Sequence, residues 1–178
     1  MAHDDSARWR DSLLTALDAS GPEGCLAADY LRAHRTPVWF LRLRPHVGAF
    51  WTPWRSVGLN QVHFTRATPP ADPSLLTLVI HEVCHLQQGI LNALSVRGEL
   101  EAWQLQFREY QRLTRPLTDP ILSELLSLPL NWDRAVLRRA RELMQAYAGK
   151  AYRADLLPLY PLPHEIRYFI THRPPSGV

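Results

Sequence analysis

Hydrophobic residues recur three and four positions apart over most of the chain, which is the spacing of one face of an α-helix. This spacing predicts a first helix that ends at Gly21-Pro22 and a short second helix over 23–34. In the last third of the chain it predicts two further helices, over 119–126 and 131–148. The proline-rich run that follows, 156–163, predicts an extended strap instead of a helix.

Between these helical regions the pattern changes to short apolar runs of the kind found in β-strands. Three segments, 38–44, 48–54 and 59–65, are extended candidates of this kind. Because they follow one another closely, we expect a small sheet that is antiparallel or mixed, with antiparallel pairing favoured. The predicted fold class is therefore α+β, with this sheet packed on the helices that follow it.

Two more helices are predicted after the sheet. The first, over 75–88, begins after the helix-start signal Asp72-Pro73 and ends at Gly89, and the second covers 92–112. No charged residue precedes His81 in the first of these helices. We therefore expect that helix to be buried in the core.

Composition narrows the class of protein. The 178 residues are 46% hydrophobic and 21% charged, which fits one globular domain and argues against disorder. The net charge is only +3, and no stripe of aromatic residues accompanies the scattered arginines, so we expect no nucleic-acid partner. No apolar run reaches the roughly 20 residues that span a bilayer, and the N-terminus does not resemble a targeting peptide. Together with two distant cysteines, Cys25 and Cys84, this predicts a cytoplasmic protein without a membrane partner.

The buried helix carries the sequence His81-Glu82-Val83-Cys84-His85. His81 and His85 lie one turn apart with an offset of about 40°, so two imidazoles can bind one ion. Glu82 points to the flank of that face, where its carboxylate can act as a general base on water instead of binding the metal. Zinc suits this site because it binds two histidine nitrogens and a carboxylate oxygen and leaves a fourth position open.

A third ligand must come from another element, and the following helix supplies Glu99 and Glu101. The two glutamates are about 200° apart on a helix, so they cannot both face one ion. Glu99 lies at the edge of the apolar stripe that contains Val96, Leu100 and Trp103, and a carboxylate there needs a cation. We therefore expect Glu99 to be the third ligand, with Glu101 as the alternative.

Other interpretations of these residues stay open at this point. Backbone carbonyls could satisfy the two histidines, and an arginine could pair with Glu82, in a core helix without metal. Cys84 points about 100° away from its neighbour His85 and is expected to be a small core residue. Gln88, one turn beyond His85, is placed to hydrogen-bond a metal ligand.

The residues His81-Glu-Val-Cys-His85 with Gln88 behind them, followed by Glu99-Leu-Glu-Ala102, resemble the gluzincin branch of zinc metallopeptidases. The resemblance covers 75–106, and it implies a zincin-like fold, one Zn²⁺ ion and a peptide or protein substrate. In that branch a glutamate followed three residues later by alanine commonly supplies the third ligand, which again implies Glu99. A departure is Trp103, which stands where many members have an aspartate or asparagine.

Gluzincins also often place a histidine or tyrosine from the C-terminal part near the oxyanion, and the candidates here are Tyr152, Tyr160 and His164. We expect a single zincin-like metallopeptidase domain over 1–178, with a metal core at about 36–113 and the C-terminal helices and strap over 114–178. The expected activity is peptide-bond hydrolysis with Glu82 as general base. The alternative is a non-catalytic zincin-like module that binds a partner protein around a structural metal.

Overall fold

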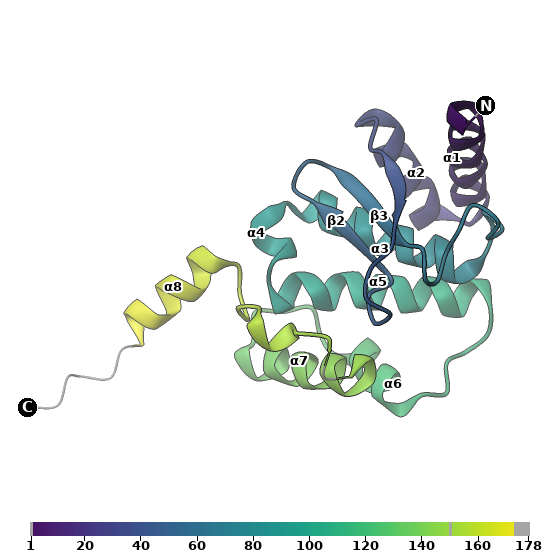
Figure 1. Ribbon diagram of the computed structural model, residues 1–178. Helices are drawn as coiled ribbons and strands as arrows, with labels where there is room; N and C mark the ends of the chain where they lie inside the picture. Colours follow the sequence, from purple (N-terminus) through teal and green to yellow (C-terminus); the bar gives the residue numbers. More distant parts are fainter. Residues whose placement is uncertain (1, 150, 173–178) are drawn as a thin grey trace, which may run out of the picture.

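The computed structural model describes residues 2–149 and 151–172. Over these residues the chain folds into eight α-helices, one short 3₁₀ helix and a three-stranded mixed sheet, which is an α+β fold (Figure 1). The helices are α1 (Ala2–Ala19), α2 (Pro22–Ala33), α3 (Pro73–Gln88), α4 (Ile90–Ala93), α5 (Val96–Leu113), α6 (Pro120–Ser127), α7 (Arg134–Ala148) and α8 (Leu162–Thr171). The strands are β1 (Val38–Leu41), β2 (Ala49–Thr52) and β3 (Ser56–Asn60), and the 3₁₀ helix η1 is Ala154–Leu156.

The sheet has the order β1-β3-β2, with β1 parallel and β2 antiparallel to β3. The antiparallel pairing favoured from sequence is therefore wrong for β1. The long loop after β1 carries the chain to the far side of the sheet, and a tight turn then returns it between the first two strands. The third strand also begins and ends earlier than predicted. At its end, the Asn60 side-chain amide donates to the carbonyls of Arg44 and Val47 in the loop after β1.

Helix α3 lies at the centre of the molecule. The Asp72 carboxylate caps its first turn by accepting a hydrogen bond from Leu75 N at 3.0 Å, and Gly89, at φ 75°, ends it. Leu78 apart, every residue from position 75 to position 85 is buried, as the uncharged sequence predicted. One side of α3 packs on the sheet and α2, and another side packs along α5.

The helix predicted over 92–112 is divided into α4 and α5. The Ser95 hydroxyl accepts a hydrogen bond from Gly98 N at 3.1 Å and so starts α5 as a new helix. The N–H groups of Val96 and Arg97, which have no partner within the helix, donate to the carbonyls of Pro158 and Leu159. The proline-rich strap therefore caps the N-terminus of α5.

The predicted strap ends at Pro161, and the segment beyond it forms α8, a helix that the sequence pattern did not predict. In Figure 1 this helix extends away from the rest of the molecule. Arg134 contacts it from the body, since its guanidinium bonds the Glu165 carboxylate at 2.6 Å and lies 4.2 Å from the centre of the Tyr168 ring. The rings of His164 and Tyr168 also pack on Trp132 and Tyr160. In the described part of the chain, no helix combines the length and the apolar character needed to cross a membrane.

The buried apolar side chains form two clusters. The first lies among α1, α2, the sheet and α3, and the second lies among α5, α6, α7 and the strap. Helices α3 and α5, which pack along each other, join the two clusters. The candidate site lies at this junction.

Candidate metal centre

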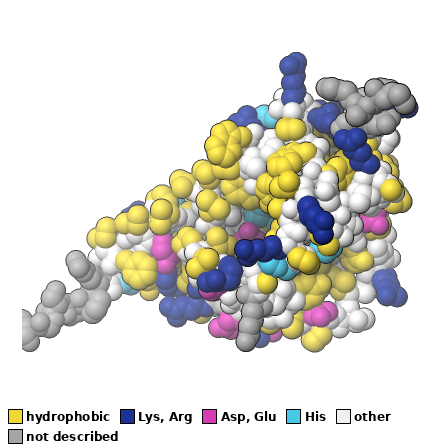
Figure 2. Space-filling view, in the orientation of Figure 1, with side chains coloured by type: hydrophobic (Ala, Val, Ile, Leu, Met, Phe, Trp, Pro, Cys, Tyr) yellow, Lys and Arg dark blue, Asp and Glu magenta, His cyan; other side chains and the backbone are white. Residues whose placement is uncertain are grey.

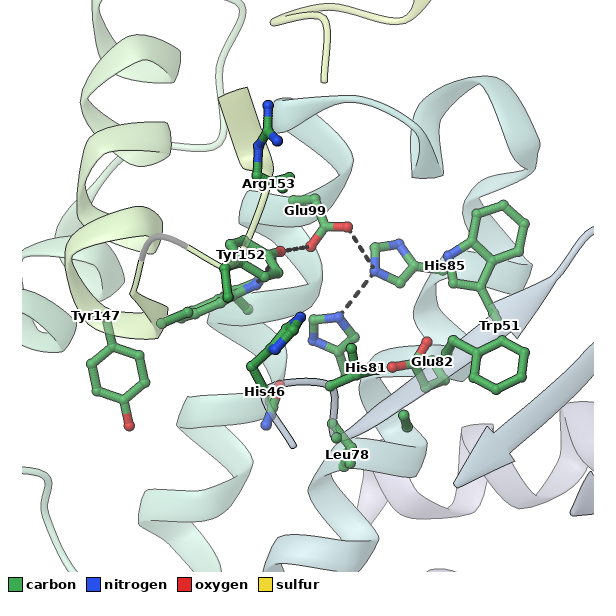
Figure 3. Close-up of a pocket in the computed structure, with 18 of the residues that line it drawn as sticks. His46, Trp51, Leu78, His81, Glu82, His85, Glu99, Tyr147, Tyr152 and Arg153 are labelled. Atoms are coloured by element: carbon green, nitrogen blue, oxygen red, sulfur yellow. Dashed lines mark hydrogen bonds and ion pairs between the residues drawn. The ribbon is translucent and has the colours of Figure 1, made fainter. Parts of the chain in front are cut away.

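Three side chains that the sequence predicted as metal ligands converge between α3 and α5. The Nε2 atoms of His81 and His85 are 3.0 Å apart, and Glu99 Oε1 lies 3.6 Å from His85 Nε2. Donor atoms from all three lie within 4.8 Å of one another, and Figure 3 shows the side chains pointing toward a common point. Both histidines are buried and Glu99 is half-buried, so this group can hold a metal ion.

Gln88 determines which nitrogen of His85 carries the hydrogen. The Gln88 amide nitrogen donates to Gly98 O at 3.0 Å and to Glu101 Oε2 at 3.2 Å, and both partners are acceptors only. Its carbonyl oxygen therefore faces His85 Nδ1, at 3.2 Å, and accepts the hydrogen from it. The other nitrogen of His85, Nε2, then offers a bare lone pair to the centre, which is the form that binds a metal.

The surroundings of His81 favour its neutral form. Burial, followed by the repulsion of a charged His85, holds the pKa of His81 well below its usual value, and the Ala102 carbonyl and the Gln106 side chain offset part of that fall. Without a cation, the hydrogen bond between the two Nε2 atoms requires one of them to carry a hydrogen, so only one of the two can offer a lone pair. A bound cation removes this conflict, because each histidine can then present a lone pair from Nε2. The donor set therefore fits a metal ion.

Glu101 has a different position from Glu99. Its Oε2 accepts hydrogen bonds from Arg97 at 2.7 Å and from Gln88 at 3.2 Å, and it is not in the group of converging donors. Of the two glutamates, the structure thus brings Glu99 to the histidines and Glu101 to the side chain that orients His85.

Glu82 lies beside the three converging donors and is 4% exposed. Burial, followed by repulsion from Glu99, raises the pKa of Glu82 well above its usual value. Cys84 does not belong to the group of converging donors, and burial raises the pKa of its thiol to about 12. It is a small core residue, as the sequence predicted.

The converging donors and Glu82 line a cavity of about 600 Å³. Its walls come mainly from the β1–β2 loop, β2, α3, α5, the end of α7 and the segment after α7. They are rich in aromatic residues, namely Phe50, Trp51, Trp103, Phe107, Tyr147 and Tyr152. In Figure 2, histidine and acidic side chains are visible in a recess bordered by hydrophobic and basic groups. A metal held here would therefore be reachable by a molecule in the cavity.

One of the three C-terminal candidates reaches the site. The Tyr152 hydroxyl donates to Glu99 Oε2 at 2.5 Å, and burial, followed by the Glu99 charge, raises the pKa of the phenol well above its usual value. Tyr160 instead donates to the Trp132 carbonyl at 2.9 Å, and His164 packs against the Trp132 ring. Neither of these two lines the cavity.

The sequence interpretation missed His46, which lies in the loop after β1 and lines the same cavity as the metal donors (Figure 3). It also missed the contribution of Trp51, whose ring centre lies 5.9 Å from that of His85. An isolated histidine in a loop has no periodic signal, so no pattern could have indicated it. Trp51 belongs to a predicted strand, but its contact with His85 depends on how the sheet packs on α3.

Comparison with known proteins gives no assignment. No family model matches the sequence, and neither a curated protein nor a solved structure matches the chain. The function must therefore be argued from the site itself.

Proposed function

We propose that this protein is a zinc-dependent metallopeptidase in which His81, His85 and Glu99 bind the metal and Glu82 is the general base. The observation that carries the proposal is the convergence of these three donors on the wall of an open cavity, beside a buried carboxyl group that binds no other side chain among the interactions described. Two imidazoles and one carboxylate form a donor set typical of catalytic zinc, with a coordination position left for water or substrate.

When bound, zinc lowers the pKa of water toward neutrality and polarises a substrate carbonyl. The protein's contribution is to move the proton. Glu82 accepts a proton from the attacking water and delivers it to the amine nitrogen that leaves the cleaved peptide bond. Burial, followed by repulsion from Glu99, raises the pKa of Glu82, so its carboxyl group takes up a proton more readily than an exposed glutamate does.

The free edge of strand β2 beside the cavity supports a peptide as substrate. Strand β2 is at the edge of the sheet in the described part of the chain, and most of it lines the cavity. Gly48 O accepts from Asn60 N, so the alternation of an antiparallel pair directs the backbone groups of Ala49 and Trp51 to the outer edge. An extended peptide can add to such an edge through its own backbone.

The alternative of a structural metal predicts a fourth protein ligand that closes the coordination sphere. The group of converging donors found among the described residues contains three members, and all three line the cavity. This arrangement favours hydrolysis over a purely structural role.

Metal analysis combined with peptide cleavage tests the proposal. Purified protein should contain about one equivalent of zinc by elemental analysis, and His81→Ala and His85→Ala should lose it, whereas His164→Ala, outside the cavity, should retain it. Glu82→Gln should keep the zinc and cleave a random peptide mixture about 10²–10⁴-fold more slowly, because the proton acceptor is gone. Full metal content in both histidine variants would refute the metal site, and undiminished cleavage by Glu82→Gln would refute the mechanism.

A further inference from the structure

Tyr152 contacts the candidate metal centre through Glu99. Its hydroxyl donates to Glu99 Oε2 at 2.5 Å and accepts a hydrogen bond from Trp103 Nε1 at 3.0 Å (Figure 3). The Trp103 indole has only this one N–H group to donate, and a carboxylate oxygen can only accept. The direction of both hydrogen bonds is therefore fixed, from Trp103 to Tyr152 and from Tyr152 to Glu99.

The two oxygens of Glu99 are thereby made different. Oε2 receives the Tyr152 hydrogen, while Oε1 faces His85 Nε2 at 3.6 Å and receives no hydrogen bond among the interactions described. The Glu99 side chain has three rotatable bonds, and fixing them costs conformational entropy. If the side chain were free to rotate, this cost would arise when the metal binds. A hydrogen bond already made in the protein reduces that cost.

Aromatic packing holds Tyr152 in this position. Its ring centre is 5.4 Å from that of Trp103, and Trp103 packs in turn on Phe107 and Tyr147 in edge-on and tilted arrangements. Trp103 is 6% exposed, so the indole N–H is fixed by the core of the second hydrophobic cluster. The position of the Glu99 carboxylate is thus connected to that core.

We propose that Tyr152, oriented by Trp103, is a positioning residue that holds Glu99 so that it presents one oxygen, Oε1, to the metal. This inference rests on the metal site proposed above. It assigns Tyr152 a different role from stabilising the oxyanion, because the single hydroxyl hydrogen is already donated to Glu99 and is not free for a substrate oxygen. One-oxygen binding by Glu99 also preserves a coordination position for the reaction.

Zinc affinity measured by competition with a chromogenic chelator tests this proposal. Tyr152→Phe removes only the hydroxyl, and the dissociation constant for zinc should rise about 10–100-fold, as is typical when the partner of a metal ligand is lost. Trp103→Phe keeps an aromatic ring but removes the N–H, and should weaken zinc binding less. Tyr160→Phe is the matched control, since its hydroxyl bonds the Trp132 carbonyl outside the cavity, and its zinc affinity should equal that of the wild type.

A double-mutant cycle separates positioning from other roles. If Tyr152 acts through Glu99, Tyr152→Phe should weaken zinc binding no further when Glu99 is already alanine. At saturating zinc, Tyr152→Phe should recover most of its kcat, whereas loss of an oxyanion donor would lower kcat at full occupancy and leave zinc affinity intact.

The outcomes distinguish this inference from the proposed function. Wild-type protein that binds zinc together with an unchanged affinity in Tyr152→Phe would overturn the positioning role alone. A wild type that binds no zinc would overturn both. If Tyr152→Phe does not fold by circular dichroism, an unchanged affinity in a folded Trp103→Phe variant would overturn the proposal in its place.

Discussion

Two glutamates on the same helix act at different distances from the candidate metal. Glu99 faces the histidines directly, whereas Glu101 anchors Gln88, which in turn orients His85. The acidic side chain of Glu101 is itself held by Arg97. These contacts link Arg97 through Glu101 and Gln88 to His85, and they make Gln88 the residue on which the His85 tautomer depends.

We predict that Gln88→Ala weakens zinc binding about tenfold, because His85 Nδ1 loses the acceptor that keeps the hydrogen away from Nε2. The neighbouring variant Gln87→Ala is the matched control, since Gln87 is exposed on the same turn of α3, and its affinity should not change. Chelator competition measures both. Equal affinities in the two variants would show that the Gln88 contact does not influence the ligand.

The sequence predicted the candidate ligands whose positions depend on the periodicity of a single helix. A spacing of four residues places His81 and His85 on one face whatever the rest of the fold does, and the apolar stripe of α5 placed Glu99 at its buried edge. Tyr152 is different, because it lies 53 positions from Glu99 and meets it only through the path of the chain after α7. No local pattern carries that information, so Tyr152 was one of three equal candidates.

At the scale of elements, the sequence predicted that α3 is buried and where it ends, because charge-free helices and glycine breaks are local signals. It did not predict the division of the following helix at Ser95. There the Ser95 hydroxyl accepts from one N–H group and the carbonyls of the distant strap accept from two others, which makes a new helix start more favourable than continuation. The helix α8 was missed because Pro158, Pro161 and Pro163 make the approach to it and its first turn resemble an extended strap. Its docking also depends on a distant residue, Arg134 from α7.

The corner between α4 and α5 is packed tightly at Gly98. A Cβ atom placed there would lie 2.1 Å from the Asn92 carbonyl oxygen, so Gly98→Ala must shift the first turn of α5 and with it Glu99. We expect a loss of about 1–3 kcal/mol in the free energy of unfolding and a weaker affinity for zinc. Urea unfolding and chelator competition measure the two effects.

Gly89→Ala is the comparison for this corner, because a Cβ there meets no atom within 4 Å and only the positive φ of 75° is strained. That variant should lose a similar amount of stability, about 1–3 kcal/mol, but keep its zinc affinity. If Gly98→Ala also kept its affinity, the position of the α5 start would not matter to the site.

At the scale of the whole molecule, the candidate metal centre joins two halves of the core. His81 and His85 belong to α3, which packs in the first hydrophobic cluster, whereas Glu99 and Tyr152 belong to segments of the second. Hydrophobic periodicity predicted the α+β class and the buried helix, but it carries no information on strand order, and so the parallel pairing of β1 with β3 was not foreseen. The packing of the two hydrophobic clusters against each other could likewise not be predicted from the sequence pattern, because it depends on contacts between distant segments.

A metal bound at this junction links the two clusters and should stabilise the native state by mass action. At a free zinc concentration about a thousand times the dissociation constant, the gain is about 4 kcal/mol, which for a chain of this length raises Tm by roughly 8–16 °C. Calorimetry of metal-free and zinc-loaded protein measures the shift. Glu99→Ala should lose most of it, because the link to α5 is gone, while Glu124→Ala, which breaks a surface pair with Arg139, should keep it. A full shift in Glu99→Ala would mean that α3 alone holds the metal and that the two halves are not joined through it.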